Sequence, residues 1–216
     1  MIAPEIFKGS SFMNLDMGVP NEIKFDTELP IGKVFPRLDL PLWEDTLPYY
    51  NPDFNFVEDN TIIDGHFEDE RYFEHRMKEI KQWLYTKPMV IPRDLCVIGF
   101  RGGEYYTIPE LGLPKEYFDR AIEKIREIKP KMRFEVHTDD RATAEVFFPD
   151  FPIIQDVEKN WQAVRYARYA IIANSSFYVL PRLMHGGFTI APRYWNRYNT
   201  KKWEFPQNYY KQFIYI

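Results

Sequence analysis

The sequence predicts an α/β protein with a Rossmann-like parallel sheet and flanking helices. Three features of its second half support this prediction. Nearly continuous apolar runs, as in Leu95–Phe100 and Ala170–Ala173, are typical of strands buried on both faces. Amphipathic segments of helix length separate these runs, and Lys115–Ile128 has apolar residues at helical spacing. Polar turns follow the runs. Strands separated by helices of this length pair in parallel through right-handed crossovers.

Composition limits the classes of function. The 216 residues suffice for one large domain or two small ones. A formal net charge of -4 argues against a protein that binds nucleic acid mainly through contacts with its phosphates. The single cysteine, Cys96, lies in an apolar run and fits a reducing compartment. Met1–Ser11 has no continuous apolar core of signal-peptide length, and no window approaches the apolar length of a membrane span, so we expect a cytoplasmic protein without an integral membrane segment.

The first part of the chain, residues 1–88, is predicted to be a reduced, irregular region. Prolines recur up to Pro52 and disfavour long helices. Short extended pieces are expected at 22–25, 32–35 and 61–64. A helix is expected from Phe67 until Lys87-Pro88, because four apolar residues then share one helical face. These are Phe73, Met77, Ile80 and Leu84.

The second part, residues 89–216, is predicted to be the Rossmann-like domain. Its first strand is Leu95–Phe100, and Pro130 ends the helix Lys115–Ile128. The remaining elements are expected, in chain order, as a strand at Arg133–His137, an extended piece within 147–154, a helix at Asn160–Tyr169, a strand at Ala170–Ala173, a helix through Met184 and a strand at Phe188–Ala191.

Three polar clusters follow predicted strands: Arg101–Glu104, Thr138–Asp140 and Asn174–Ser176. In an open parallel sheet, ligands bind beyond the carboxyl ends of the strands, so the clusters are expected to converge on a nucleotide. An arginine pairs with phosphate through its planar fork, and serines and free N–H groups donate to phosphate oxygens. Aspartates accept from nucleobase or ribose groups. The other interpretations stay open: a surface arginine with a turn, an Asx-type helix cap and a plain N-cap.

The same segments resemble the motifs of a known family. Ile98–Tyr105 is similar to H-x-R-R-G-D-Y, Phe134–Asp140 to F-x-x-F-S-D-D, and Ile171–Phe177 to I-I-A-N-S-S-F. Asp64–Phe73 is similar to G-Y-F-Q-S-E-K-Y-F, and Thr189–Trp195 to V-I-A-P-x-x-W. These patterns belong to the α-1,2-fucosyltransferase family, glycosyltransferase family 11.

The resemblance implies the nucleotide-binding half of a GT-B glycosyltransferase at 89–216, with 1–88 as the acceptor-side region. It implies inverting transfer of fucose from GDP-fucose, or of another sugar from its GDP-sugar, to a glycan hydroxyl, without a metal or a further cofactor. Arg101 is then the catalytic residue that holds the diphosphate leaving group. The donor site implied by the motifs consists of Arg101, Gly103, Glu104, Asp139, Asp140, Asn174, Ser175, Ser176 and Phe177.

The chain departs from the family pattern at several positions. The motif's His is Gly99, its second Arg is Gly102 and its Asp is Glu104. The S-W-W after the last motif is Tyr178–Leu180, and the glycine-rich start G-G-L-G-N-Q is not found. These departures favour an alternative, a non-catalytic structural or glycan-binding protein with the same fold. A nucleotide-binding regulator of unrelated ancestry is a third hypothesis.

No metal site is expected from the histidines. They have no metal-ligand spacing to cysteines or acids. The four are His66, His75, His137 and His185.

Overall fold

The computed structural model describes residues 41–44, 50–58, 61–64, 67, 69–108, 111–194 and 210–216. The chain forms two compact units, one with the described residues up to Lys87 and the other with those from Pro88 onward. The extended pieces expected at 22–25 and 32–35 lie outside the described residues, as do Gly65, His66 and Trp195 of the family-like segments.

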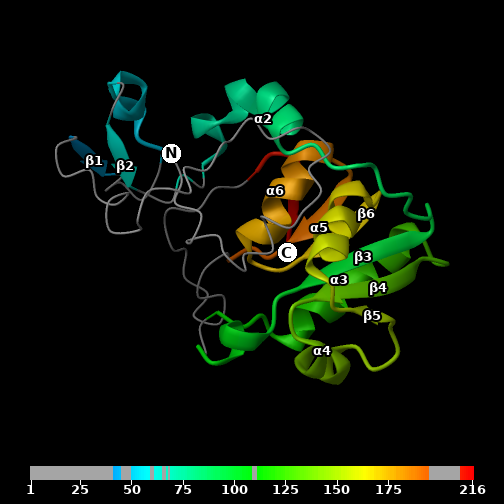
Figure 1. The fold of residues 1–216 in the computed structure, drawn as a ribbon. Coiled ribbons are helices and arrows are strands. Elements are labelled where there is room, and N and C mark those ends of the chain that lie inside the picture. Colours follow the sequence, from blue (N-terminus) through cyan, green and yellow to red (C-terminus); the bar gives the residue numbers. More distant parts are fainter. Residues whose placement is uncertain are drawn as a thin grey trace, which may run out of the picture. The chain divides into compact units, whose positions relative to one another are not determined.

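The second unit is an α/β fold around a six-stranded parallel sheet (Figure 1). The strands are β3 (Leu95–Phe100), β4 (Arg133–Thr138), β5 (Ile153–Ile154), β6 (Tyr169–Ile172), β7 (Phe188–Ala191) and β8 (Ile214–Tyr215). Their order is β5-β4-β3-β6-β7-β8, and every pair is parallel. The chain starts in the middle, builds one side, then returns to build the other, which is the Rossmann strand order. The predicted Rossmann-like sheet is thereby confirmed.

Helices cover both faces of this sheet. They are α3 (Lys115–Ile128), α4 (Arg141–Phe147), α5 (Val157–Tyr166) and α6 (Ser176–His185), with the 3-10 helix η6 (Gly103–Tyr106) after β3. Phe100 packs its ring against Phe118 of α3 at 5.5 Å between centroids, whereas Gly99 faces Tyr178 of α6. Successive strand residues point to opposite faces, so α3 and α6 cover opposite sides. Helix α5 packs beside α6 (Figure 1).

Gly99 and Tyr178 fit each other closely at the end of β3. A Cβ atom on Gly99 would lie 2.8 Å from the Tyr178 ring, so the ring occupies the space that a side chain at 99 needs. The buried Tyr178 hydroxyl donates to the carbonyl oxygens of Phe100 at 2.9 Å and His137 at 3.1 Å. Tyr178 therefore ties the carboxyl ends of β3 and β4 together.

The first unit is small and mostly irregular where it is described. A two-stranded parallel sheet joins β1 (Leu42–Glu44) to β2 (Ile62–Asp64), which confirms the short strand expected at 61–64. The other elements are η3 (Pro52–Phe56), η4 (Glu70–Tyr72), η5 (Glu74–Arg76) and α2 (Met77–Trp83). Aromatic rings pack together around Phe54, whose ring centroid lies 5.1 Å from that of Tyr72 and 5.6 Å from that of Trp43.

Several expected boundaries are wrong. The helix expected from Phe67 begins only at Met77, because the Asp69 carboxylate accepts from the Arg71 backbone N–H at 2.9 Å and starts 3-10 turns instead. The short extended piece expected within 147–154, by contrast, is confirmed as β5, Ile153–Ile154, after α4 has ended at Phe147.

The helix expected at Asn160–Tyr169 is shifted towards the N-terminus of the chain. It is α5, Val157–Tyr166, because the Asp156 side chain caps it through the Lys159 N–H at 3.0 Å. Tyr169 then opens β6.

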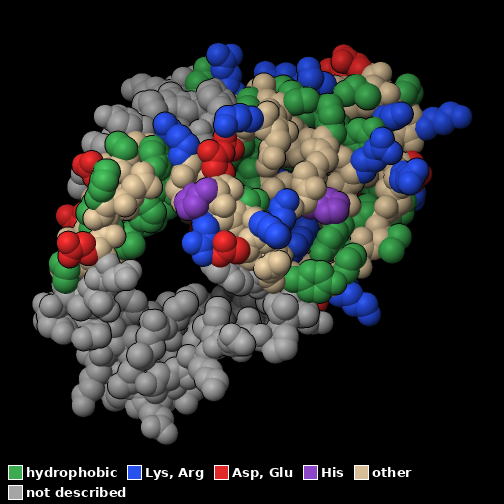
Figure 2. All heavy atoms as spheres, turned by 90° about the horizontal axis from the view of Figure 1, so that it is seen from above, with side chains coloured by type: hydrophobic (Ala, Val, Ile, Leu, Met, Phe, Trp, Pro, Cys, Tyr) green, Lys and Arg blue, Asp and Glu red, His purple; other side chains and the backbone are tan. Residues whose placement is uncertain are grey.

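The surface of the described residues carries mixed charge. In the face seen in Figure 2, Lys and Arg side chains are scattered among hydrophobic and other side chains rather than gathered into one patch. Among the helices of the described residues, none combines the length and the apolar character that crossing a membrane requires.

Candidate functional site

The carboxyl ends of β3, β4 and β6 bring the predicted clusters to one edge of the sheet. In the register of the sheet, Phe100 lies opposite Thr138, and Gly99 lies opposite Ile172. Strands β3 and β6 are the first and fourth strands of the domain, so this edge includes the point where the strand order reverses. Ligands of open α/β sheets bind in the crevice at that point.

Arg101 is the centre of an ionic network at this edge. Its guanidinium donates to the Asp139 carboxylate and, at 3.0 Å, to Glu104. The second Asp139 oxygen accepts the Gly102 N–H at 2.9 Å. Burial lowers the pKa of Arg101, but the nearby carboxylates more than offset this, so the net shift is upward. The Arg101 side chain is 30% exposed and remains within reach of solvent.

Asp140 binds the loop that carries Arg101 and caps helix α4. Its carboxylate accepts the Gly103 N–H at 2.9 Å, the Thr143 N–H at 3.2 Å and the Thr143 hydroxyl. These hydrogen bonds lower the pKa of Asp140, and the one from the Thr143 hydroxyl has the largest effect. A Cβ atom on Gly102 would lie 2.5 Å from the Asp140 Cβ, so only glycine fits there without a shift. Of the interpretations that the sequence left open, the Asx-type helix cap is the one that the structure shows for Asp140.

The turn between β6 and α6 keeps free hydrogen-bonding groups. Ser175 is the N-cap of α6, but its side chain makes no capping bond, so the first N–H groups of this helix have no partner among the residues that the structure describes. These belong to exposed Ser176 and half-buried Phe177.

Asn174 precedes this turn and is almost fully buried. It donates through Nδ2 to the Leu111 carbonyl at 3.0 Å. Its Oδ1 is buried and has no hydrogen-bond partner among the described residues. An unpaired buried acceptor is uncommon in a folded protein and calls for an explanation, such as a bound group.

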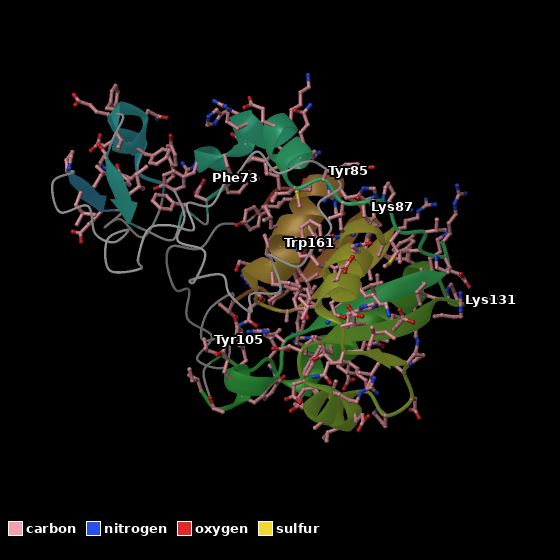
Figure 3. All side chains as sticks on the ribbon, viewed as in Figure 1. Phe73, Tyr85, Lys87, Tyr105, Lys131 and Trp161 are labelled. Atoms are coloured by element: carbon pink, nitrogen blue, oxygen red, sulfur yellow. The ribbon has the colours of Figure 1, made fainter. Side chains whose placement is uncertain are left out.

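Tyr105 lies beside Arg101 at this edge, and the site residues predicted from the sequence did not include it. The centre of the Arg101 guanidinium lies 5.3 Å from the centroid of the Tyr105 ring. Burial is the main cause that raises the pKa of Tyr105. Figure 3 shows Tyr105 and Lys131 at opposite ends of the domain, at the carboxyl and amino edges of the sheet. We call Arg101, Tyr105, Asn174, Ser175 and Ser176 the carboxyl-edge site.

The described histidines contribute no metal centre. No group of three or more His, Cys, Asp or Glu side chains that could hold a metal occurs in the described part of the chain. His137 is buried between two side chains, with Nδ1 3.0 Å from Asn160 Oδ1 and Nε2 2.9 Å from Glu135 Oε1. His137 therefore has a structural role in the buried core next to the carboxyl edge.

Comparison with known proteins adds no identification. We found no significant match to this chain among protein-family models, curated proteins or solved structures. The function is accordingly inferred from the carboxyl-edge site and from the motif resemblance.

Proposed function

We propose that the Rossmann-like domain binds a nucleoside diphosphate sugar at the carboxyl-edge site and acts as a glycosyltransferase of the inverting, GDP-fucose-dependent kind. The observation that carries the proposal is the convergence of Arg101 and the Ser175-Ser176 turn at the point where the strand order reverses. A permanent cation and a row of free N–H and hydroxyl donors are the groups that recognise a diphosphate. The motif resemblance supplies guanosine diphosphate and fucose as the first ligands to test.

The proposed chemistry assigns one role to each group. Arg101 neutralises the charge that develops on the diphosphate as the glycosidic bond breaks, and this lowers the barrier. Ser175, Ser176 and the first-turn N–H groups hold the remaining phosphate oxygens. Asp139 keeps the guanidinium in place through its two hydrogen bonds to the loop. A glycan hydroxyl is the acceptor.

The experiment is a calorimetric titration of the whole chain, without added metal, with GDP-fucose, GDP, GDP-mannose and UDP-sugars. Binding is expected to be guanine-selective and at least about ten-fold weaker in Arg101→Ala, since a hydrogen-bonded charge pair is lost. Arg133→Ala is the matched control. Arg133 also pairs with an aspartate, Asp94 at 2.9 Å, but at the amino edge of the sheet.

The control variant is expected to bind as the wild type does. Binding that is confirmed in this way then justifies a transfer assay over a panel of glycan acceptors. Lack of binding to every nucleotide contradicts the proposal.

A non-catalytic binding protein of the same fold is the second candidate, and two observations favour it. Asp139 and Glu104 already balance the charge of Arg101, and Tyr178 fills the space over Gly99 where the family-like motif has a histidine. Such a protein is expected to bind a glycan, or its structural partner, without any nucleotide. A glycan-binding screen in the absence and presence of GDP separates the two candidates.

A further inference from the structure

We propose that Gln155 is a positioning residue of the carboxyl-edge site. Together with Asn160 it holds the two peptide groups that flank Asp139, and Asp139 in turn fixes the Arg101 guanidinium before a ligand binds. The inference deepens the proposed function and rests on it for the ligand. The positioning itself can be measured without any ligand.

Asp139 is the residue that sets the place of Arg101. One of its carboxylate oxygens accepts from the Arg101 guanidinium, and the other accepts the Gly102 N–H at 2.9 Å. The side chain and the backbone of the loop are therefore bound to one carboxylate. An arginine loses rotamer freedom when it binds a ligand, and a guanidinium that is already held in place loses less.

The backbone at Asp139 lies beyond the paired part of the sheet. The register of β4 with β3 ends at Thr138, opposite Phe100. The register of β4 with β5 ends one residue earlier, at His137. Asp139 consequently lies outside both ladders, and side chains supply the hydrogen bonds that a ladder gives elsewhere.

Two amide side chains hold the peptide groups on either side of Asp139. Asn160 of α5 donates through Nδ2 to the Thr138 carbonyl at 2.7 Å. Gln155, which directly precedes the N-cap of α5, donates through Nε2 to the Asp139 carbonyl at 2.9 Å. The end of β4 is thus bound to the start of α5 on both sides of the residue that binds the guanidinium.

The two amides differ in what else they contact. Asn160 is buried, and its Oδ1 lies 3.0 Å from His137 Nδ1, so it also belongs to the core. Gln155 is exposed, and its amide bonds to the Asp139 carbonyl at the surface. Replacement of Gln155 therefore removes a constraint on Asp139 and leaves the core intact.

Gln162 provides a matched control on α5. Its Nε2 also donates to an oxygen of the protein, Glu158 Oε1 at 3.0 Å, in an exposed hydrogen bond. That bond lies within α5 and not between α5 and β4. Methionine is unbranched like glutamine and lacks the amide donor, so Gln155→Met and Gln162→Met each remove one comparable hydrogen bond.

The first measurement is amide hydrogen exchange of the whole chain by NMR, without a ligand. The Gly102 N–H is the reporter, because it donates to the Asp139 carboxylate. Its exchange is expected to be about three-fold faster in Gln155→Met, as for the partial loss of one hydrogen bond, and unchanged in Gln162→Met. In an Asp139→Ala background, Gln155→Met is expected to add no further increase, because it acts through Asp139.

The second measurement is calorimetric titration with inorganic pyrophosphate and with GDP. Gln155→Met is expected to bind both probes about three-fold more weakly than wild type, and Gln162→Met is expected to bind them as wild type does. The urea midpoint of both variants is expected to equal that of wild type, which separates positioning from a loss of stability.

Unchanged Gly102 exchange in Gln155→Met overturns the inference, whatever the probes do. Equally faster exchange in both glutamine variants also overturns it, because the change is then general to α5. Faster exchange in Gln155→Met with unchanged affinity for the probes overturns the inference for the ligand. Faster exchange confined to Gln155→Met, in a chain that binds neither probe, supports the positioning and overturns the proposed function.

Discussion

Two arginines mark opposite edges of the sheet and differ in the oxygens that bind them. Arg182 of α6 is fully buried and donates to neutral oxygens near the amino ends of β6 and β7. Its partners are Thr189 Oγ1 at 2.8 Å and the carbonyls of Val164 at 2.9 Å and Ala167 at 2.7 Å. Arg101 at the carboxyl edge is partly exposed and donates to carboxylates.

The difference shows how one side-chain type serves the fold at one edge and the candidate site at the other. Burial lowers the pKa of Arg182 to about 10, which indicates a cation with little solvation and fixed partners. Such partners cannot leave without exposing the end of α5. The carboxylates around Arg101 are partly exposed, and under the proposed function they give way to another anion.

Arg182→Met is expected to have the largest effect. The buried carbonyls of Val164 and Ala167 then lose their hydrogen-bond donor, and the free energy of unfolding is expected to fall by about 3 kcal/mol. Urea unfolding followed by circular dichroism measures the loss. The folded fraction is expected to keep its affinity for GDP, because the carboxyl-edge site is untouched. A loss below about 1 kcal/mol contradicts the structural role of Arg182.

Gly102→Ala moves the test to the carboxyl edge. The added Cβ would lie 2.5 Å from the Asp140 Cβ, so the loop or α4 must shift, at a cost of about 2 kcal/mol as for other overpacked sites. Gly103→Ala is the comparison. At Gly103 the space is open, but its φ of +52° disfavours a side chain, at a cost of about 1 kcal/mol.

Urea unfolding and pyrophosphate titration of both variants measure these effects. Only Gly102→Ala is expected to displace Asp140 and weaken pyrophosphate binding. Equal affinity of the two variants contradicts the view that Asp140 sets the loop beside Arg101.

The contrast between the edges also explains how much of the fold the sequence predicts. The bounds expected for Leu95–Phe100, Lys115–Ile128 and Phe188–Ala191 match β3, α3 and β7, because a continuous apolar run or a clear helical period ends at a polar turn or a proline. Strand β8 was not predicted. The two residues of β8 have no strand-like sequence pattern around them, and they form a strand only because they pair with the edge strand β7.

The candidate site was predictable in its location but not in its pairing. Polar clusters after apolar runs indicated the carboxyl edge. That Asp139 binds Arg101 depends on β4 lying beside β3, which the order of residues does not specify. Tyr105 was missed because its position over the Arg101 guanidinium depends on how the chain folds after β3.

Asp140→Ala is expected to make the carboxyl edge less sensitive to acid. The pKa of Asp140 is lowered in the folded state, so its stabilisation is present above the unfolded pKa of about 4 and is lost as the pH falls through the folded value. The variant is expected to lose about 1 kcal/mol at pH 7, as for a lost N-cap, and less below pH 4.

Urea unfolding across this pH range measures the difference between wild type and Asp140→Ala. Arg182→Met serves as the comparison from the amino edge, because the partners of Arg182 are neutral. Its deficit is expected to stay constant over the same range. A deficit of Asp140→Ala that does not shrink in acid contradicts the role of its charge.

Glu104→Gln is expected to have the smallest effect, and it tests whether a carboxylate at the carboxyl edge can yield to a ligand. Glu104 is 70% exposed and accepts from the Arg101 Nη2 at 3.0 Å, so it competes with a phosphate for the same guanidinium. Exposed pairs contribute little stability, and removal of the charge is expected to leave unfolding unchanged and to tighten pyrophosphate binding about three-fold. Glu127→Gln on α3 changes the net charge equally and is expected to have no effect. Weaker binding by Glu104→Gln means instead that Glu104 orients Arg101 for its ligand, and the carboxyl edge is then as fixed in its partners as the amino edge.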